Sequence, residues 1–163
     1  MTKPDALPSE NLISLFSWLI PITYLIHIAE EFWGGEGYSA YIYRLRGVHL
    51  SPTRFLVAQA IGFALVVAAI IIARRLRFPS MMFVILTMTL MVNALTHTYN
   101  AVVLQSYNPG LVSSVLIWLP MGIFALVRFY RATTQKRYWL AIAIGIGINV
   151  VVGVITMRGG RLT

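Results

Sequence analysis

Two groups of ionisable and amide side chains lie inside segments that are otherwise apolar. One is the run His27-Ile-Ala-Glu30-Glu31, near the end of the first apolar segment, and the other is Asn93-Ala-Leu-Thr-His97-Thr-Tyr-Asn100, within the third. A charged side chain at the centre of a bilayer costs about 2.5 kcal/mol or more, so such residues mark a functional site by default. We therefore expect these two segments to carry the chemistry of the protein.

Helical spacing aligns the members of each group. Residues i, i+3, i+4 and i+7 of a helix share one face. Two stripes arise in this way: Tyr24, His27 and Glu31, with Glu30 at their edge, and Asn93, His97 and Asn100. If the stripes face each other, two imidazoles and one or two carboxylates converge among several amides.

Two histidines and one carboxylate form a ligand set that zinc and non-haem iron use, with positions left open for water or substrate. We predict metal ligation by His27, Glu31 and His97, with zinc as the first candidate and iron as the second. Glu31 and Glu30 are the candidate catalytic residues, since a positioned carboxylate can activate a water molecule. The candidate substrate-binding residues are Asn93, Asn100, Tyr24 and Asn149.

The same side chains also have a purely structural interpretation, because His, Asn and Gln often form hydrogen bonds between membrane helices. This interpretation is favoured for Asn149, which Gly145 and Gly153 flank on a face suited to close packing. Gln59 is open to the same interpretation. For the two groups taken together, the coincidence of acids, histidines and asparagines at one depth favours a functional site.

The composition indicates an integral membrane protein. Of the 163 residues, 58% are hydrophobic and 11% are charged, whereas soluble domains carry about 25% charged residues. About 20 apolar residues span a bilayer as a helix. We predict an all-α, polytopic bundle in one membrane domain, residues 1–163, with five transmembrane helices: Leu12–Trp33, Pro52–Ala73, Pro79–Leu104, Leu111–Tyr130 and Tyr138–Met157. An interfacial helix is predicted between the first two, where Tyr38, Tyr41, Ile42 and Leu45 recur at helical spacing.

The basic residues predict the orientation of the chain. Five spans place eight of them on the side of the N-terminus: Lys3, Arg74, Arg75, Arg77, Arg128, Arg131, Lys136 and Arg137. The opposite side holds five: Arg44, Arg46, Arg54, Arg158 and Arg161. The more basic side faces the cytoplasm, so we expect a cytoplasmic N-terminus and an external C-terminus. Met1–Asn11 lacks the features of a cleaved secretion signal. With this orientation, both polar groups lie in the outer half of the membrane.

The net charge of +8 does not indicate a nucleic-acid partner. The basic residues cluster beside the spans, a placement that suits membrane orientation and contact with anionic headgroups. We expect membrane lipids and an apolar or lipid-like small molecule as partners, and a homo-oligomer is compatible with the sequence. The absence of cysteine excludes disulfides and thiolate metal sites.

The string His27-x-x-Glu30-Glu31 in the first helix of a small polytopic chain resembles the HXXEE-domain family. That family comprises small bacterial and archaeal integral membrane proteins named for this motif, with a downstream motif resembling Asn93…His97…Asn100. The resemblance extends from the first helix to the fifth and implies a prokaryotic cytoplasmic membrane. It also implies a metal or catalytic site that includes His27, Glu30, Glu31, Asn93 and His97, without indicating a reaction.

A second resemblance fails at three positions. Glutamate-type intramembrane proteases of the CAAX-processing kind use Glu-Glu-x-x-x-Arg, Phe-x-x-x-His and His-x-x-x-Asn motifs. In this chain Gly35 stands where the Arg is required, Asn93 replaces the Phe, and Gly145 replaces the last His. Spacing alone does not carry a function from one family to another.

Three functions are compatible with these observations. The first, which we favour, is a membrane-embedded, metal-dependent enzyme that acts on a lipid or other apolar substrate. The second is a proton-linked carrier with a His/Glu relay, for which five helices without an internal repeat are a poor scaffold unless the protein dimerises. The third is a structural or accessory subunit whose polar groups lock helices together.

Overall fold

The computed structural model describes residues 10–130 and 133–159, and every regular element in these ranges is a helix. Two sets of sequence predictions lie outside the described residues. One is the expectation that Met1–Asn11 carries no cleaved signal, of which residues 1–9 are not described. The other concerns four basic side chains that were counted for orientation: Lys3, Arg131 and Arg161 lie outside these ranges, and of Arg158 only the backbone is described.

Five helical stretches are long and apolar enough to cross a membrane. They are α1 (Glu10–Trp33), α3 (Pro52–Arg75), α4 (Pro79–Leu104), the continuous run of α5 (Leu111–Ser113), η1 (Ser114–Trp118) and α6 (Leu119–Phe129), and α7 (Gln135–Gly159). The predicted all-α bundle is confirmed, and each predicted end lies within three residues of the observed one. A shorter helix, α2 (Tyr38–Arg46), occupies the connection where an interfacial helix was predicted.

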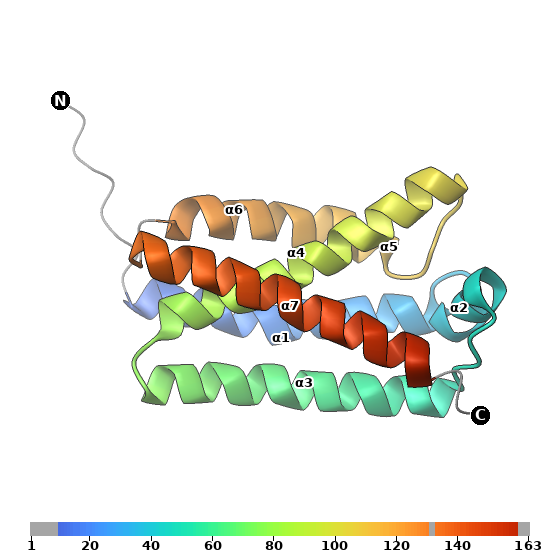
Figure 1. The fold of residues 1–163 in the computed structure, drawn as a ribbon, viewed down its shortest axis with the longest axis horizontal. Helices are drawn as coiled ribbons and strands as arrows, with labels where there is room; N and C mark the ends of the chain where they lie inside the picture. The colour runs from blue at the N-terminus through green and yellow to red at the C-terminus, as the bar shows by residue number, and fades with distance from the viewer. Residues whose placement is uncertain (1–9, 131–132, 160–163) are drawn as a thin grey trace.

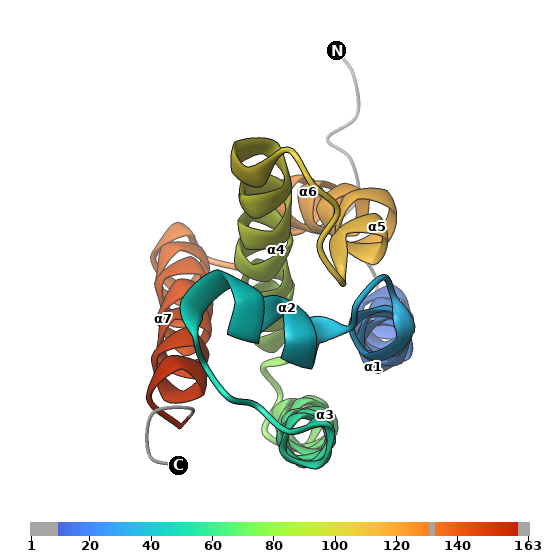
Figure 2. The same ribbon diagram turned by 90° about the vertical axis from the view of Figure 1, so that its right-hand side faces the viewer.

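Helix α4 lies at the centre of the bundle. It packs against α7, α6, η1, α1 and α3, which lie on its different sides when the bundle is viewed end-on (Figure 2). Phe83 and Leu90 of α4 form the buried core together with Ile20 of α1 and with Trp118 and Phe129 of the fourth span. By contrast, most of the apolar surface of α3 and α7 is exposed, as expected for helices that face lipid.

The starts of two spans follow from their first residues. Ser51 precedes α3 and its hydroxyl accepts a hydrogen bond from the amide of Arg54 at 3.2 Å, which satisfies one of the free amides of the first turn. Proline follows at position 52 and also opens α4 at position 79, where its missing N–H has no partner to lose. Gly47 ends α2 with φ at 65°, a conformation that glycine adopts without strain.

The fourth span widens into a π-helix over Ser114–Trp118, just before Pro120. Proline lacks the amide that would continue an α-helical ladder, and a wider turn accommodates that loss. Ser113, Ser114 and Trp118 are all buried in this stretch. This wide turn was not predicted from the sequence. It forms one side of the polar site described below.

Three parts of the chain meet near the end of the bundle that carries α2 (Figure 1). They are the last two turns of α1, the C-terminal half of α4, and the turn 105–110 that leads into α5. These are the elements that position the polar side chains described next.

Candidate metal centre

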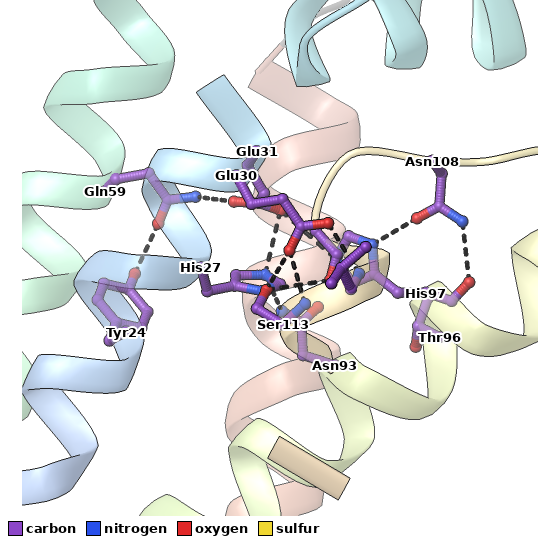
Figure 3. A network of polar contacts seen from close by, with 12 residues as sticks. Tyr24, His27, Glu30, Glu31, Gln59, Asn93, Thr96, His97, Asn108 and Ser113 are labelled. Atoms are coloured by element: carbon purple, nitrogen blue, oxygen red, sulfur yellow. Dashed lines mark hydrogen bonds and ion pairs between the residues drawn. The ribbon is translucent and has the colours of Figure 1, made fainter. Parts of the chain in front are cut away.

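Two imidazoles and one carboxylate converge between α1 and α4 (Figure 3). Oε1 of Glu31 lies 3.5 Å from Nε2 of His27 and 3.4 Å from Nε2 of His97. The two rings meet edge to face with their centroids 5.1 Å apart. All three side chains are buried, with residue exposures of 1% for His27, 4% for Glu31 and 6% for His97.

The spacing of these atoms fits a single metal ion. In a tetrahedral zinc site with ligand bonds of about 2.0–2.1 Å, the ligand atoms lie about 3.3–3.4 Å apart. The two contacts of Glu31 Oε1, at 3.5 and 3.4 Å, are close to this length, and the ligand atoms of the three residues all lie within 4.8 Å of one another. Three protein ligands leave one position for water or substrate, which is the arrangement of catalytic zinc sites.

The partner of each Nδ1 atom determines what Nε2 can do. Nδ1 of His97 lies 2.6 Å from Oδ1 of Asn108, and Nδ2 of Asn108 donates to the backbone carbonyl of His97 at 2.9 Å. An amide oxygen can only accept, so Nδ1 of His97 carries the proton. In the neutral ring, Nε2 therefore holds a lone pair, and it is directed at Glu31.

His27 is oriented in the same way by a different partner. Its Nδ1 lies 2.8 Å from the hydroxyl oxygen of Ser113, and that hydroxyl lies 2.5 Å from Oε2 of Glu30. The single proton of Ser113 goes to the carboxylate, since this hydrogen bond is the shorter and is charge-assisted. Ser113 then accepts from Nδ1–H of His27, and Nε2 of His27 is again left with a lone pair.

Three acceptor atoms thus face one another inside the bundle. Two lone-pair nitrogens and a carboxylate oxygen repel one another at such distances unless a proton or a cation lies between them. Metal sites show the same pattern, in which the second ring nitrogen of each histidine ligand donates to an oxygen that fixes its orientation. The described residues therefore fit a divalent metal held by His27, Glu31 and His97.

The second oxygen of Glu31 is also held in place. Gln59 of α3 donates to Oε2 of Glu31 at 2.8 Å, and the hydroxyl of Tyr24 donates to Oε1 of Gln59 at 2.6 Å. Nδ2 of Asn93 lies 3.4 Å from Nε2 of His27, beside the three converging atoms. Gln59 and Tyr24 orient the carboxylate, while Asn93 lies close enough to contact a molecule bound there.

Glu30 has a different environment from Glu31. Its two oxygens accept from the amides of Val112 and Ser113 at 2.8 and 2.7 Å, from the Ser113 hydroxyl, and from the hydroxyl of Tyr107 at 3.0 Å. A carboxylate at the start of a helix satisfies amides that otherwise have no partner. Burial, and then the neighbouring Glu30, raise the pKa of Tyr107 to about 12, so its hydroxyl stays protonated and donates at physiological pH.

Two residues close the cluster on opposite sides. The indole of Trp118 stacks on the ring of His27 with centroids 3.8 Å apart. Gly110 lies directly over the cluster with φ at 93°. A Cβ atom at this position would lie 2.8 Å from Cε1 of both His27 and His97. Only a glycine lets the chain reverse this close to both imidazoles.

The structure brings together most of the residues singled out in the sequence. His27, Glu31 and His97 converge, Asn93 lies beside them, and Tyr24 and Glu30 reach the cluster through Gln59 and Ser113. Two predicted substrate-binding residues lie elsewhere. Asn149 donates to the carbonyl of Thr89 at 3.2 Å and joins α7 to α4, as its structural interpretation required. Asn100 forms no hydrogen bond to the cluster within the described residues.

Four residues of the site were missed in the sequence: Asn108, Gly110, Ser113 and Trp118. The Asn-Pro-Gly run at 108–110 signals a tight turn, but a turn signal does not show what lies beneath the turn. Gln59 was left open between two interpretations, and the structure places it against Glu31. The available signal was that Gln59 is a polar residue within a span, at the same predicted depth as Glu31.

The sequence model of one protein family, described as a protein of unknown function with an HXXEE motif, matches residues 18–125. The matched segment includes both polar groups and the turn that covers them. No curated protein matches the chain. No solved structure matches it either.

Proposed function

The chain belongs to the HXXEE family, whose function is unknown, and from the geometry of its own site we propose that it is a membrane-embedded, metal-dependent enzyme. The proposed substrate is a lipid or another apolar molecule. The observation that carries the proposal is the convergence of two imidazole Nε2 atoms, each freed by a donor bond at Nδ1, on one carboxylate oxygen.

The ligand set favours zinc first and non-haem iron second. Two histidines and one carboxylate bind either metal and leave coordination positions open. A metal bound there supplies Lewis acidity, which polarises a carbonyl or phosphoryl oxygen and makes a water molecule easier to deprotonate. Zinc chemistry of this type needs no redox partner, which makes hydrolysis the simplest reaction class for the site.

The remaining residues have separable roles in this proposal. Glu31 would hold the metal through Oε1, and its Oε2, which Gln59 orients, would be the proton acceptor. Asn93 is placed to donate a hydrogen bond to an oxygen of the substrate. Glu30 has hydrogen bonds on both oxygens, so we assign it to positioning, through Ser113, instead of proton transfer.

The location of the site supports the proposal of an apolar substrate. His27 and His97 both lie within helices long and apolar enough to span a membrane, and the neighbouring surface of α3 is apolar and exposed, as at Leu65 with 66% exposure. A water-soluble metabolite would have to enter a region from which water is largely excluded. A lipid reaches the same depth by diffusion within its own leaflet.

Elemental analysis of the purified protein tests the proposal. We expect about one zinc or iron per chain in the wild type, and loss of that metal in His27→Ala. His49→Ala is the matched control, because His49 packs against Tyr43 outside the cluster and its removal should leave the metal content unchanged. In Glu31→Gln the metal should also be lost, whereas folding should survive because the variant removes a buried charge.

A proton relay is the second candidate, and one observation favours it. Tyr24, Gln59, Glu31 and the two imidazoles form a continuous chain of polar contacts between three helices. If a metal-free wild-type protein shows the same stability and the same lipid turnover as a metal-supplemented one, the metal-dependent enzyme is excluded. A proton between the imidazoles and Glu31 would then take the place of the metal.

A further inference from the structure

A groove with a volume of about 400 Å³ lies between α2 and the start of α3, away from the metal centre. It is lined by Ser39, Tyr43, His49, Leu50, Ser51 and Arg54. Within the described part of the chain, no hydrogen bond or ion pair joins these residues to His27, Glu31 or His97. Figure 2 shows α2 lying across the end of the bundle, beside the start of α3. The volume of the groove is within the range of pockets that hold small molecules.

The lining consists mainly of hydrogen-bond donors. Arg54 has a permanent positive charge, His49 has a ring N–H, and Ser39, Ser51 and Tyr43 have hydroxyl groups. The Ser51 oxygen accepts from the amide of Arg54, which leaves its own proton free to be donated into the groove. Of the residues that the structure describes, none that lines the groove carries a carboxylate.

The charge of Arg54 is not neutralised locally. Glu36 is the nearest acidic residue along this connection, and its carboxylate is already paired with Arg44 at 2.6 Å. Within the described ranges, no ion pair joins Arg54 to an acidic side chain. An arginine beside several hydroxyl donors is the usual composition of a site for a phosphate oxyanion, since guanidinium N–H groups match its oxygens.

The surface of α3 that continues from Arg54 is apolar and exposed. Ile61 and Leu65 follow Arg54 by seven and eleven residues, which places all three on one face of the helix. Both are exposed, at 57% and 66%. This face of α3 therefore has a charged end followed by an apolar track. The pattern matches a lipid with its headgroup at the membrane surface and its acyl chain alongside the helix.

We propose that this groove binds the phosphate of an anionic membrane lipid, with Arg54 as the main contact and the acyl chain along Ile61 and Leu65. The site is separate from the metal centre and does not depend on the function proposed for it. The observations that carry it are the donor-lined groove, the locally unpaired Arg54 and the apolar track that continues from it.

Native mass spectrometry of the full-length, delipidated protein titrated with phosphatidylglycerol in detergent tests the proposal. We expect the wild type to retain phosphatidylglycerol in preference to phosphatidylcholine. Arg54→Gln should weaken that binding about tenfold, the loss expected for a charge-assisted hydrogen bond. Arg75→Gln is the matched control, because it removes the same charge from the other end of the same helix and should change binding less than about twofold.

Equal losses in Arg54→Gln and Arg75→Gln would mean general attraction between a basic protein and an anionic lipid, and would overturn the proposed site. Inorganic phosphate is the second probe. It should not displace the lipid at millimolar concentration, because it cannot use the apolar track. If inorganic phosphate binds in an Arg54-dependent manner while phosphatidylglycerol does not, the groove binds a free anion and the lipid assignment is wrong. Thermal unfolding of both variants confirms that they are folded, as expected for exposed arginines.

Discussion

At the scale of single residues, the site depends on the partners of the two Nδ1 atoms. Histidine becomes a predictable metal ligand when one ring nitrogen donates to a fixed oxygen, because the other nitrogen must then present its lone pair. Asn108 does this for His97, and Ser113 does it for His27. Ser113 also donates to Glu30, so one hydroxyl connects the Glu30 carboxylate to the imidazole of His27.

Ser113 and its neighbour Ser114 provide a matched test of this role. In Ser113→Ala, His27 loses its orienting partner, and we expect metal affinity to fall about 10- to 100-fold, as for other outer partners of metal ligands. The free energy of unfolding should fall by about 1–3 kcal/mol, because the buried Nδ1 of His27 is left without a partner.

Ser114→Ala is the control, since the buried hydroxyl of Ser114 has no hydrogen-bond partner among the described residues. Its removal should leave metal affinity unchanged and stability equal or higher. Metal titration and thermal unfolding of the two variants measure both effects. The proposed orienting role fails if the two alanine variants have the same metal affinity.

Residue types and spacing predicted the centre of the site but not its surroundings. His27, Glu31 and His97 were predicted because helical periodicity and a shared depth are both readable from the sequence. Asn108 and Ser113 were not, because Asn108 lies within the turn 105–110 and Ser113 follows it, and the geometry of this turn decides where both side chains point. A polar residue such as Gln59 has the same local signature whether it orients a carboxylate or joins two helices.

At the scale of elements, the turn 105–110 is what completes the site. Asn108 fastens it to α4 through two hydrogen bonds with His97, and Tyr107 fastens it to α1 through Glu30. Gly110 then starts α5 directly over the imidazoles. The turn therefore serves as the cover of the cluster as well as the connection between two spans.

Gly110→Ala tests whether this close approach matters. The new methyl group would meet both imidazoles at 2.8 Å, and the backbone at φ 93° is unfavourable for alanine. We expect the free energy of unfolding to fall by more than about 1 kcal/mol, and metal content to fall with it because the rings must move.

Gly47→Ala separates the effect of the positive φ from the effect of the contact with the imidazoles. Gly47 also has positive φ, at 65°, but a Cβ atom there would meet nothing within 4 Å. This control should show the backbone penalty while keeping its full metal content. Thermal unfolding and elemental analysis of both proteins decide the point, and a Gly110→Ala protein with normal metal content would show that the turn does not constrain the imidazoles.

At the scale of the whole molecule, the five spans were predicted closely because apolar length is a strong signal in a chain with few charges. The packing was less accessible. Nothing in the sequence showed that α4 would be central, or that the fourth span would widen into a π-helix before Pro120. Both depend on how side chains from several helices fit together.

The fold also separates the basic residues between its two ends. The connections from α3 to α4 and from α6 to α7 lie at one end (Figure 1), which holds six of the described basic residues: Arg74, Arg75, Arg77, Arg128, Lys136 and Arg137. The other end, with α2 and the polar cluster, holds three: Arg44, Arg46 and Arg54. Positive residues favour the cytoplasmic side, so the candidate metal centre and the groove are predicted to lie toward the outer surface.

The natural absence of cysteine makes this orientation directly testable. Two single-cysteine variants, Glu36→Cys and Lys136→Cys, place the thiol at opposite ends of the bundle. Glu36 lies beside α2, and Lys136 lies at the start of α7. In intact cells, a membrane-impermeant maleimide should label the first variant and leave the second unlabelled, and cell lysis should make the two equally reactive. The reverse pattern would place the polar cluster in the cytoplasmic half of the membrane. A lipid substrate and the anionic lipid at Arg54 would then have to come from the inner leaflet, because each site can draw only on the leaflet that reaches its end of the bundle.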